Sequence, residues 1–164
     1  MEVGATMLTY KDILFSTTKI LSDNFNCDVI VENKEGTFEN ECFYVTLVPV
    51  TSEASTLKTN KKQLMLSIKY FGGSKLDNYD IADKLEGLFA RSLKVNDRYL
   101  NISSVEPNFL VDEVGDMLDF LINISYFEKA NVKITNIDSN GNVELDKNYE
   151  DNIDVMNNID VNLK

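Results

Sequence analysis

The sequence contains no histidine, no tryptophan, and only two prolines and two cysteines among its 164 residues. Histidine is the most common general base near neutral pH and the most common ligand of transition metals. Its absence excludes Ser-His-Asp and Cys-His catalysis. Cys27 and Cys42 are too few for a disulfide framework and show no CxxC spacing, so we expect both to be reduced structural residues.

The chain also has few positive charges, because 27 acidic residues oppose 16 basic ones and give a net charge of −11. This sign disfavours the contacts that drive binding to nucleic acids or anionic membranes. No stretch approaches the ~18 consecutive apolar residues of a membrane span, and the first residues lack the basic and apolar regions of a signal peptide. We expect synthesis in the cytoplasm, no specific nucleic-acid binding and no membrane partner.

Hydrophobic periodicity predicts an α+β fold. Thr9 and Asp12 form a capping-box pattern that opens a helix over residues 9–25, and a second helical period begins at Asp77 or Asn78 and ends at Leu93. Alternating apolar residues predict the strands, which we place at residues 27–32, 41–50, 64–71, 99–105 and 117–127. The expected order is α-β-β-β-α-β-β, with the helices packed on one face of a mainly antiparallel sheet.

The composition changes near residue 130, which divides the chain into an α+β domain (residues 1–130) and an acidic appendage rich in Asn and Asp (residues 131–164). The appendage is either disordered or ordered against a partner. Asn140-Gly141 suits a tight hairpin turn. A calcium loop is disfavoured, because Val143 and Tyr149 stand where such a loop needs glycine and glutamate.

Two further patterns resemble catalytic or ligand-binding sites but have simpler interpretations. The carboxylates of Asp112, Glu113, Asp116 and Asp119 surround Gly115, as in an exposed connection between two strands. The pair Gly72-Gly73 lacks the other glycine and the lysine of a phosphate-binding loop and is interpreted as a strand terminator. We therefore expect no catalytic, cofactor-binding or metal-binding residues, no cofactor and no enzymatic activity.

The polar segment 51–62 is the best candidate for an interaction site. It lies between two strong strands and is longer than an ordinary hairpin loop, which is typical of functional connections. It also gathers three lysines in an acidic chain. We predict an arm that contacts another protein, the alternative being a solvated loop, and the candidate interface residues are Thr51, Ser52, Glu53, Ser55, Thr56, Leu57, Lys58, Thr59, Lys61 and Lys62.

Between about residues 7 and 129 the sequence resembles the tail terminator proteins of tailed phages and of phage-tail-like bacteriocins from low-GC Gram-positive hosts. The resemblance lies in MLTYKDIL at the first helix, the spaced segments ECFYVTLVP, QLMLSIKYFGG and YDIADKLEGLF, and the closing strand LDFLINISYFEK. It covers the α+β domain but not the appendage.

The resemblance implies a small α+β protomer without enzymatic activity. It further implies a homo-oligomeric ring, expected to be a hexamer, that is assembled into the virion or bacteriocin at the head-proximal end of the tail tube. There the ring would end tube growth and contact the tube protein and sheath, neck or collar proteins. A neck or head-tail connector protein is the main alternative, and an acidic protein-binding module that is not structural is a weaker one.

Overall fold

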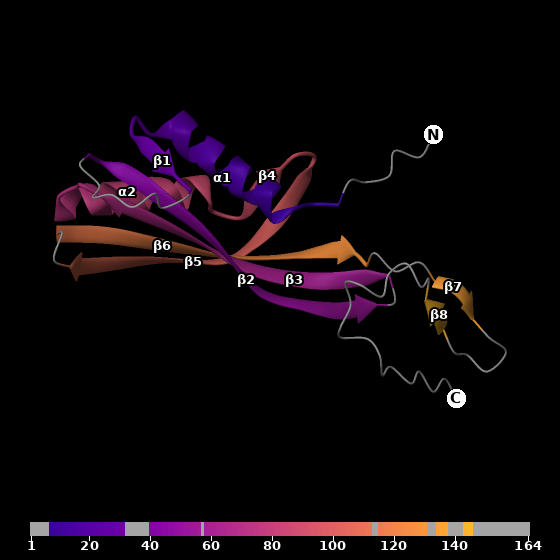
Figure 1. Cartoon of the computed structure of the whole chain (residues 1–164). Coiled ribbons are helices and arrows are strands. Elements are labelled where there is room, and N and C mark those ends of the chain that lie inside the picture. Colours follow the sequence, from indigo (N-terminus) through magenta and orange to yellow (C-terminus); the bar gives the residue numbers. More distant parts are fainter. Residues whose placement is uncertain are drawn as a thin grey trace.

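The computed structural model describes residues 7–31, 40–56, 58–112, 115–130, 134–137 and 143–145. Two helices, α1 (Tyr10–Asn24) and α2 (Lys75–Leu88), lie on one side of a six-stranded sheet (Figure 1). The sheet has the order β1-β2-β3-β6-β5-β4. Its strands are β1 (Asp28–Ile30), β2 (Cys42–Thr56), β3 (Thr59–Phe71), β4 (Ser92–Val95), β5 (Arg98–Asp112) and β6 (Gly115–Lys129).

The α+β class is confirmed, but the expected details of the sheet are only partly right. The sheet is mixed, because β1 pairs with β2 in parallel, whereas the other pairs are antiparallel. The predicted order also omits β4. A separate two-stranded sheet joins β7 (Ile134–Ile137) to β8 (Val143–Leu145) in antiparallel pairing. This pairing agrees with the hairpin predicted around Asn140-Gly141, although the turn itself lies outside the described residues.

Both helices begin at capping boxes. The hydroxyl of Thr9 accepts the amide N–H of Asp12, whose carboxylate accepts the amide of Thr9, as the sequence predicts. The pair Ser74 and Asp77 repeats this arrangement at α2, so α2 begins at Lys75, a few residues before its predicted start. Each box pairs amides that would otherwise lack a partner in the first helical turn.

The end of α2 is the clearest error of the prediction. The helix ends at Leu88, and Leu93 belongs to β4 instead. In β4 the buried residues Leu93 and Val95 alternate with the exposed Ser92 and Lys94, which is the period of a strand. A two-residue turn with Asn96 at a φ of 53° then leads into β5. The apolar spacing of Leu88, Phe89 and Leu93 hid this change of period.

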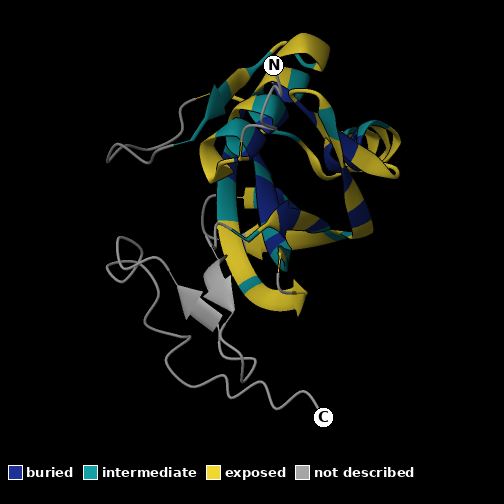
Figure 2. Ribbon diagram, turned by 90° about the vertical axis from the view of Figure 1, so that its right-hand side faces the viewer, coloured by how far each residue is buried: buried dark blue, intermediate teal, exposed yellow. Residues whose placement is uncertain are grey.

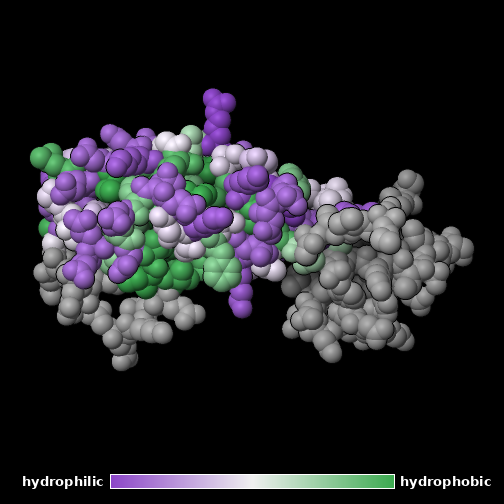
Figure 3. Space-filling view, turned by 90° about the horizontal axis from the view of Figure 1, so that it is seen from above, coloured by the Kyte–Doolittle hydropathy of each residue, from purple (hydrophilic) through white to green (hydrophobic). Residues whose placement is uncertain are grey.

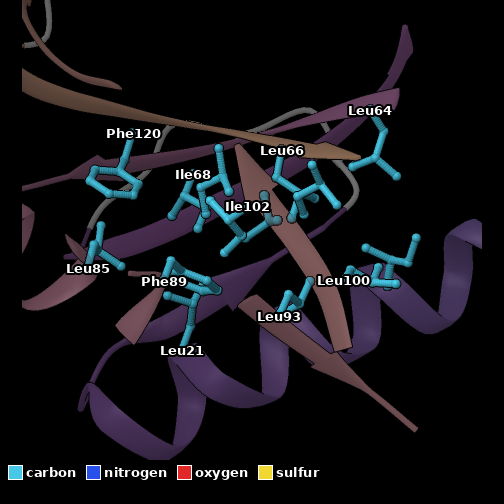
Figure 4. Packing of buried hydrophobic residues seen from close by; sticks show 14 of the residues in the cluster. Leu21, Leu64, Leu66, Ile68, Leu85, Phe89, Leu93, Leu100, Ile102 and Phe120 are labelled. Carbon is cyan, nitrogen blue, oxygen red and sulfur yellow. The ribbon is translucent and has the colours of Figure 1, made fainter. Parts of the chain in front are cut away.

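The hydrophobic core lies between the helices and one face of the sheet, as Figure 2 shows by burial. From Leu64 to Tyr70 in β3 and from Leu118 to Glu128 in β6 every second residue is buried, including Leu66, Ile68, Phe120 and Ile122. Leu21 of α1 and Leu85 of α2 approach these strands from the helix side, with Phe89, Leu93 and Leu100 beside them (Figure 4). The alternation predicted for both strands is confirmed.

The two prolines of the chain occupy the two free edges of the sheet. β1 pairs with β2 only as far as Tyr44, so within the described residues the part of β2 that holds Pro49 has an open edge. β4 pairs with β5 only as far as Asn101, which leaves Pro107 on the other open edge. Proline has no backbone donor, so it is tolerated there and hinders pairing with a further strand. Pro107 does not end its strand, contrary to the sequence-based expectation.

Candidate protein-interface arm

Residues 51–56 and 59–62 form strands and not a loop. β2 and β3 continue as a ladder from Thr51 paired with Gln63 to Thr56 paired with Thr59. β6 lies on the other side of β3, from Ser125 beside Gln63 to Lys129 beside Thr59. The expected loop conformation is therefore wrong. These residues are polar on both faces, so they show no hydrophobic alternation, and their strand conformation depends on the partner strands.

We call this three-stranded extension, comprising residues 51–56, 58–63 and 125–129, the arm. It projects beyond the helices at the end of the sheet opposite α2 (Figure 1). Ser52, Glu53, Ser55, Thr56 and Lys58 are exposed. Thr51, Thr59, Lys61 and Lys62 are half-buried, and Leu57 lies outside the described residues. Five of the ten candidate interface residues are thus exposed, and four more are partly accessible.

Hydrogen bonds fix the conformation of the arm. The Thr51 hydroxyl donates to Gln63 Oε1 at 3.0 Å, and the hydroxyls of Thr56 and Thr59 share a hydrogen bond of 2.6 Å. The backbone N–H of Lys58 donates to the Thr56 hydroxyl at 3.2 Å. The carbonyl of Lys58 accepts the N–H of Ala130 at 2.8 Å, which ties the turn to the end of β6. The arm is therefore an ordered ladder that extends the sheet.

The lysines of the arm do not share one surface. Lys61 is paired with Phe127 and Lys62 with Tyr126, and since successive strand residues point to opposite faces, the two lysines lie on opposite sides of the arm. Lys62 Nζ lies 5.6 Å from the ring centroid of Tyr10 on the helix side, which is within cation–π range. Lys61 lies on the face away from the helices.

An ion pair joins the outer part of the arm to the first residue of β5. Arg98 Nη1 donates to both carboxylate oxygens of Glu128, at 3.0 and 2.8 Å, and Arg98 Nη2 donates to the carbonyl of Phe127 at 2.6 Å. Tyr126 lies beside this pair. Its burial is the largest cause that raises its pKa to about 12, and the neighbouring Tyr10 and Glu128 add smaller contributions. Its phenol is therefore neutral at physiological pH, and the Arg98–Glu128 pair in the outer part of the arm is charge-compensated.

The arm is basic although the chain is acidic. It carries Lys58, Lys61, Lys62 and Lys129 against Glu53 and Glu128, a net charge of +2, whereas the chain as a whole has −11. Lys129, which the sequence-based site omitted, joins the group because β6 pairs with β3. This neighbour could have been found only by predicting that the last strand of the domain reaches the arm.

The acidic residues around Gly115 do not form a common site in the described part of the chain. β5 ends at Asp112 and β6 begins at Gly115, which has a φ of 131°, so the predicted connection is confirmed. Asp116 and Asp119 are three residues apart in β6 and point to opposite faces. Asp119 accepts the hydroxyl of Ser67 at 2.7 Å. Glu113 lies outside the described residues, among which no group of His, Cys, Asp or Glu could hold a metal ion.

A second surface, at the end of the molecule opposite the arm, was missed by the sequence analysis. The rings of Tyr79 in α2 and Phe109 in β5 lie with centroids 4.6 Å apart, and both side chains are about 40% exposed. Leu76 and Val111 beside them are 75% and 80% exposed. The sequence signal was the apolar run FLV after Pro107, which we had placed outside the strand. None of the helices described is long and apolar enough to cross a membrane.

The fold and the arm define a small α+β structural domain whose distinctive surfaces suit contact with other proteins. The sequence profile of a phage tail terminator family matches residues 12–136, which is most of the chain. The protein therefore belongs to the phage tail terminator family, whose members have a role in tail completion. The match includes β7 and so extends slightly past the expected domain boundary at residue 130.

Comparison with solved structures supports the fold independently. One matching protein is 12% identical, with a TM-score of 0.51 over 75% of this chain and 96% of its own. At this identity the likeness concerns the fold alone. A comparison with curated protein sequences finds no match.

Proposed function

We propose that the protein is a tail terminator that closes into a ring of six subunits at the head-proximal end of a phage tail tube. There it ends tube growth and presents a surface to tube, sheath or neck proteins. The observation that carries the proposal is the family match over residues 12–136. This match favours a terminator over the neck connector considered above, and it likewise disfavours an acidic module without a structural role.

The arm is the part of the protomer to which we assign the contact with a neighbouring subunit or with the last ring of the tube. Its ordered hydrogen bonds lower the entropy lost on binding. Its basic side chains would meet acidic partner surfaces, where exposed charges mainly govern association rate and register. We further propose that the protein has no enzymatic activity, since its role as a ring component requires only binding.

Electron microscopy of purified particles with this chain labelled tests the role directly. We expect the label at the end of the tail that joins the head. A label along the tube or at the distal tip would contradict the proposal, and a label on the neck above the tube would favour the connector. The same images show whether a capsid is present, which distinguishes a phage from a bacteriocin.

A shortened chain tests the role of the arm. Replacing residues 52–62 with Asn-Gly joins Thr51 to Gln63, which are already partners in the ladder. Loop and hairpin changes of this kind cost little stability when the core is intact, so circular dichroism should show a folded protomer. We expect tails of irregular length. Tails of normal length with the shortened chain would show that the arm is dispensable for capping.

A further inference from the structure

The two ends of the protomer carry unlike surfaces. The arm lies at one end. At the other, Leu76, Tyr79, Asp80 and Asp83 share one face of α2, because they are spaced by three and four residues, and Phe109 and Val111 continue this surface on β5. We call these six residues the distal face. All six are exposed. Figure 3 shows hydrophobic residues at the surface among hydrophilic ones at this end of the molecule.

The two elements of the distal face are joined by a contact between aromatic rings. Tyr79 and Phe109 contact each other across α2 and β5. Val111 follows Phe109 by two residues and so points to the same side of the sheet. Among the described residues, Val111 and Leu76 are the two most exposed large hydrophobic residues, at 80% and 75%. Exposed apolar groups gathered in this way mark a site of protein contact.

The arm matches the distal face in both polarity and charge. It presents exposed Val50 beside its base and exposed Phe127 on β6, together with Lys58 and Lys61. The distal face presents apolar groups beside Asp80 and Asp83. Lysines of one surface can therefore oppose aspartates of the other while the apolar groups of both are buried, which is the pattern of a complementary interface.

One protomer cannot bring these two surfaces together. Lys61 and Tyr70 are nine residues apart on β3, about 30 Å at ~3.3 Å per residue, and Tyr70 pairs with Leu118 near the tip of the β5–β6 hairpin. The matching surface must come from another molecule. When unlike surfaces at opposite ends of identical chains meet, the contact is heterologous and generates a ring if the rotation closes.

We propose that the arm of one subunit docks on the distal face of a second copy of this chain. Lys58 and Lys61 face Asp80 and Asp83, and the apolar side chains Leu76, Phe109 and Val111 are buried beneath the arm. This inference rests on the proposed ring but names the two surfaces that form it, so the ring could exist through other surfaces if this assignment were wrong.

The test uses two variants of the full chain, each with one altered surface. Lys58→Glu with Lys61→Glu reverses the charge at two positions of the arm. Asp80→Lys with Asp83→Lys reverses the charge of the distal face. A matched control, Lys19→Glu with Lys94→Glu, changes the net charge as the arm variant does but at exposed sites outside both surfaces. Molar mass is measured by light scattering after gel filtration, and folding of each protein by thermal melting.

We expect the native chain and the control to form the same oligomer and each surface variant to be a folded monomer. Mixing the two variants should restore oligomers of alternating subunits, because the native arm of one variant meets the native distal face of the other and the two reversed surfaces also carry opposite charges. Combining all four changes in one chain should restore oligomers, since the charges are exchanged. Leu76→Ser with Val111→Ser should weaken assembly at least tenfold without lowering the melting temperature.

Three results would overturn the assignment: a monomeric native chain at all concentrations, surface variants that assemble as the control does, or a mixture that contains only monomers. Particle imaging gives an independent reading of the proposed function. Labelled native chain at the head-proximal end would preserve the terminator role even if this contact were wrong.

Discussion

The guanidinium of Arg98 holds the carboxylate of Glu128 with two hydrogen bonds, and so joins the first residue of β5 to the outer part of the arm on β6. Glu128 is only 5% exposed, whereas Arg98 is 33% exposed at its side chain. A carboxylate this buried requires a partner, because desolvation penalises an unpaired charge. The pair therefore fixes the position of the arm relative to the domain.

Removing this arginine should destabilise the fold. Breaking a buried ion pair costs about 3 to 5 kcal/mol, and we expect Arg98→Ala to fall at or below the lower end of this range because Arg98 is partly solvated. Glu128→Gln should be milder, since the amide can still accept from the guanidinium. Urea unfolding of both variants measures the difference. Equal stability of Arg98→Ala and the native chain would show that the pair contributes nothing.

Ile122 tests the register of the central strand. It is fully buried between its partners Leu66 and Val105. Ile122→Asp would place a carboxylate in the core and should cost more than about 4 kcal/mol, enough to prevent folding. The control Ile122→Val should cost only about 0.5 to 1.5 kcal/mol. Soluble expression and unchanged melting of the aspartate variant would mean that Ile122 does not face the core.

Two glycines should respond in opposite ways to alanine. Gly72 has a φ of 94°, and a Cβ there would lie 2.9 Å from the Cα of Glu41. We expect Gly72→Ala to lose about 1 to 3 kcal/mol through strain. Gly87 in α2 has open space around its Cα, and Gly87→Ala should gain about 0.5 to 1 kcal/mol. Thermal melting compares them, and a stabilised Gly72→Ala would contradict the observed turn.

The capping boxes predict a loss of stability in acid. Hydrogen bonds from Thr9 and Ser74 hold the pKa values of Asp12 and Asp77 below their usual 3.8. Because a lowered pKa in the folded state favours folding when the group is ionised, this contribution is present above about pH 4 and disappears as the pH falls through the folded pKa. Asp12→Asn with Asp77→Asn should flatten the dependence of melting temperature on pH in this range. A dependence as steep as that of the native chain would assign it to other carboxylates.

Local sequence determined the capped start of α1, the alternating strands of the core and the α+β class. Thr9 and Asp12 interact within one helical turn, and the burial of Ile122 follows from a period of two that its neighbours repeat. The resemblance to tail terminators likewise arises from these segments and agrees with the family match over residues 12–136. Such features depend on residues close together in the chain, so the sequence contains the information needed to predict them.

The tertiary structure alone decided the arm, the end of α2 and the distal face. Residues 51–56 and 59–62 are polar on both faces, and they belong to the sheet because β2 pairs with β3 and β3 pairs in turn with β6, more than sixty residues later. Leu93 fits either a helix or a strand, and the hairpin with Leu100 selects the strand. Tyr79 and Phe109 become one surface because α2 packs against the tip of β5. The arm and the distal face depend on contacts between residues thirty or more positions apart, and the end of α2 depends on a hairpin partner seven residues on. Local hydrophobic periodicity encodes none of these pairings.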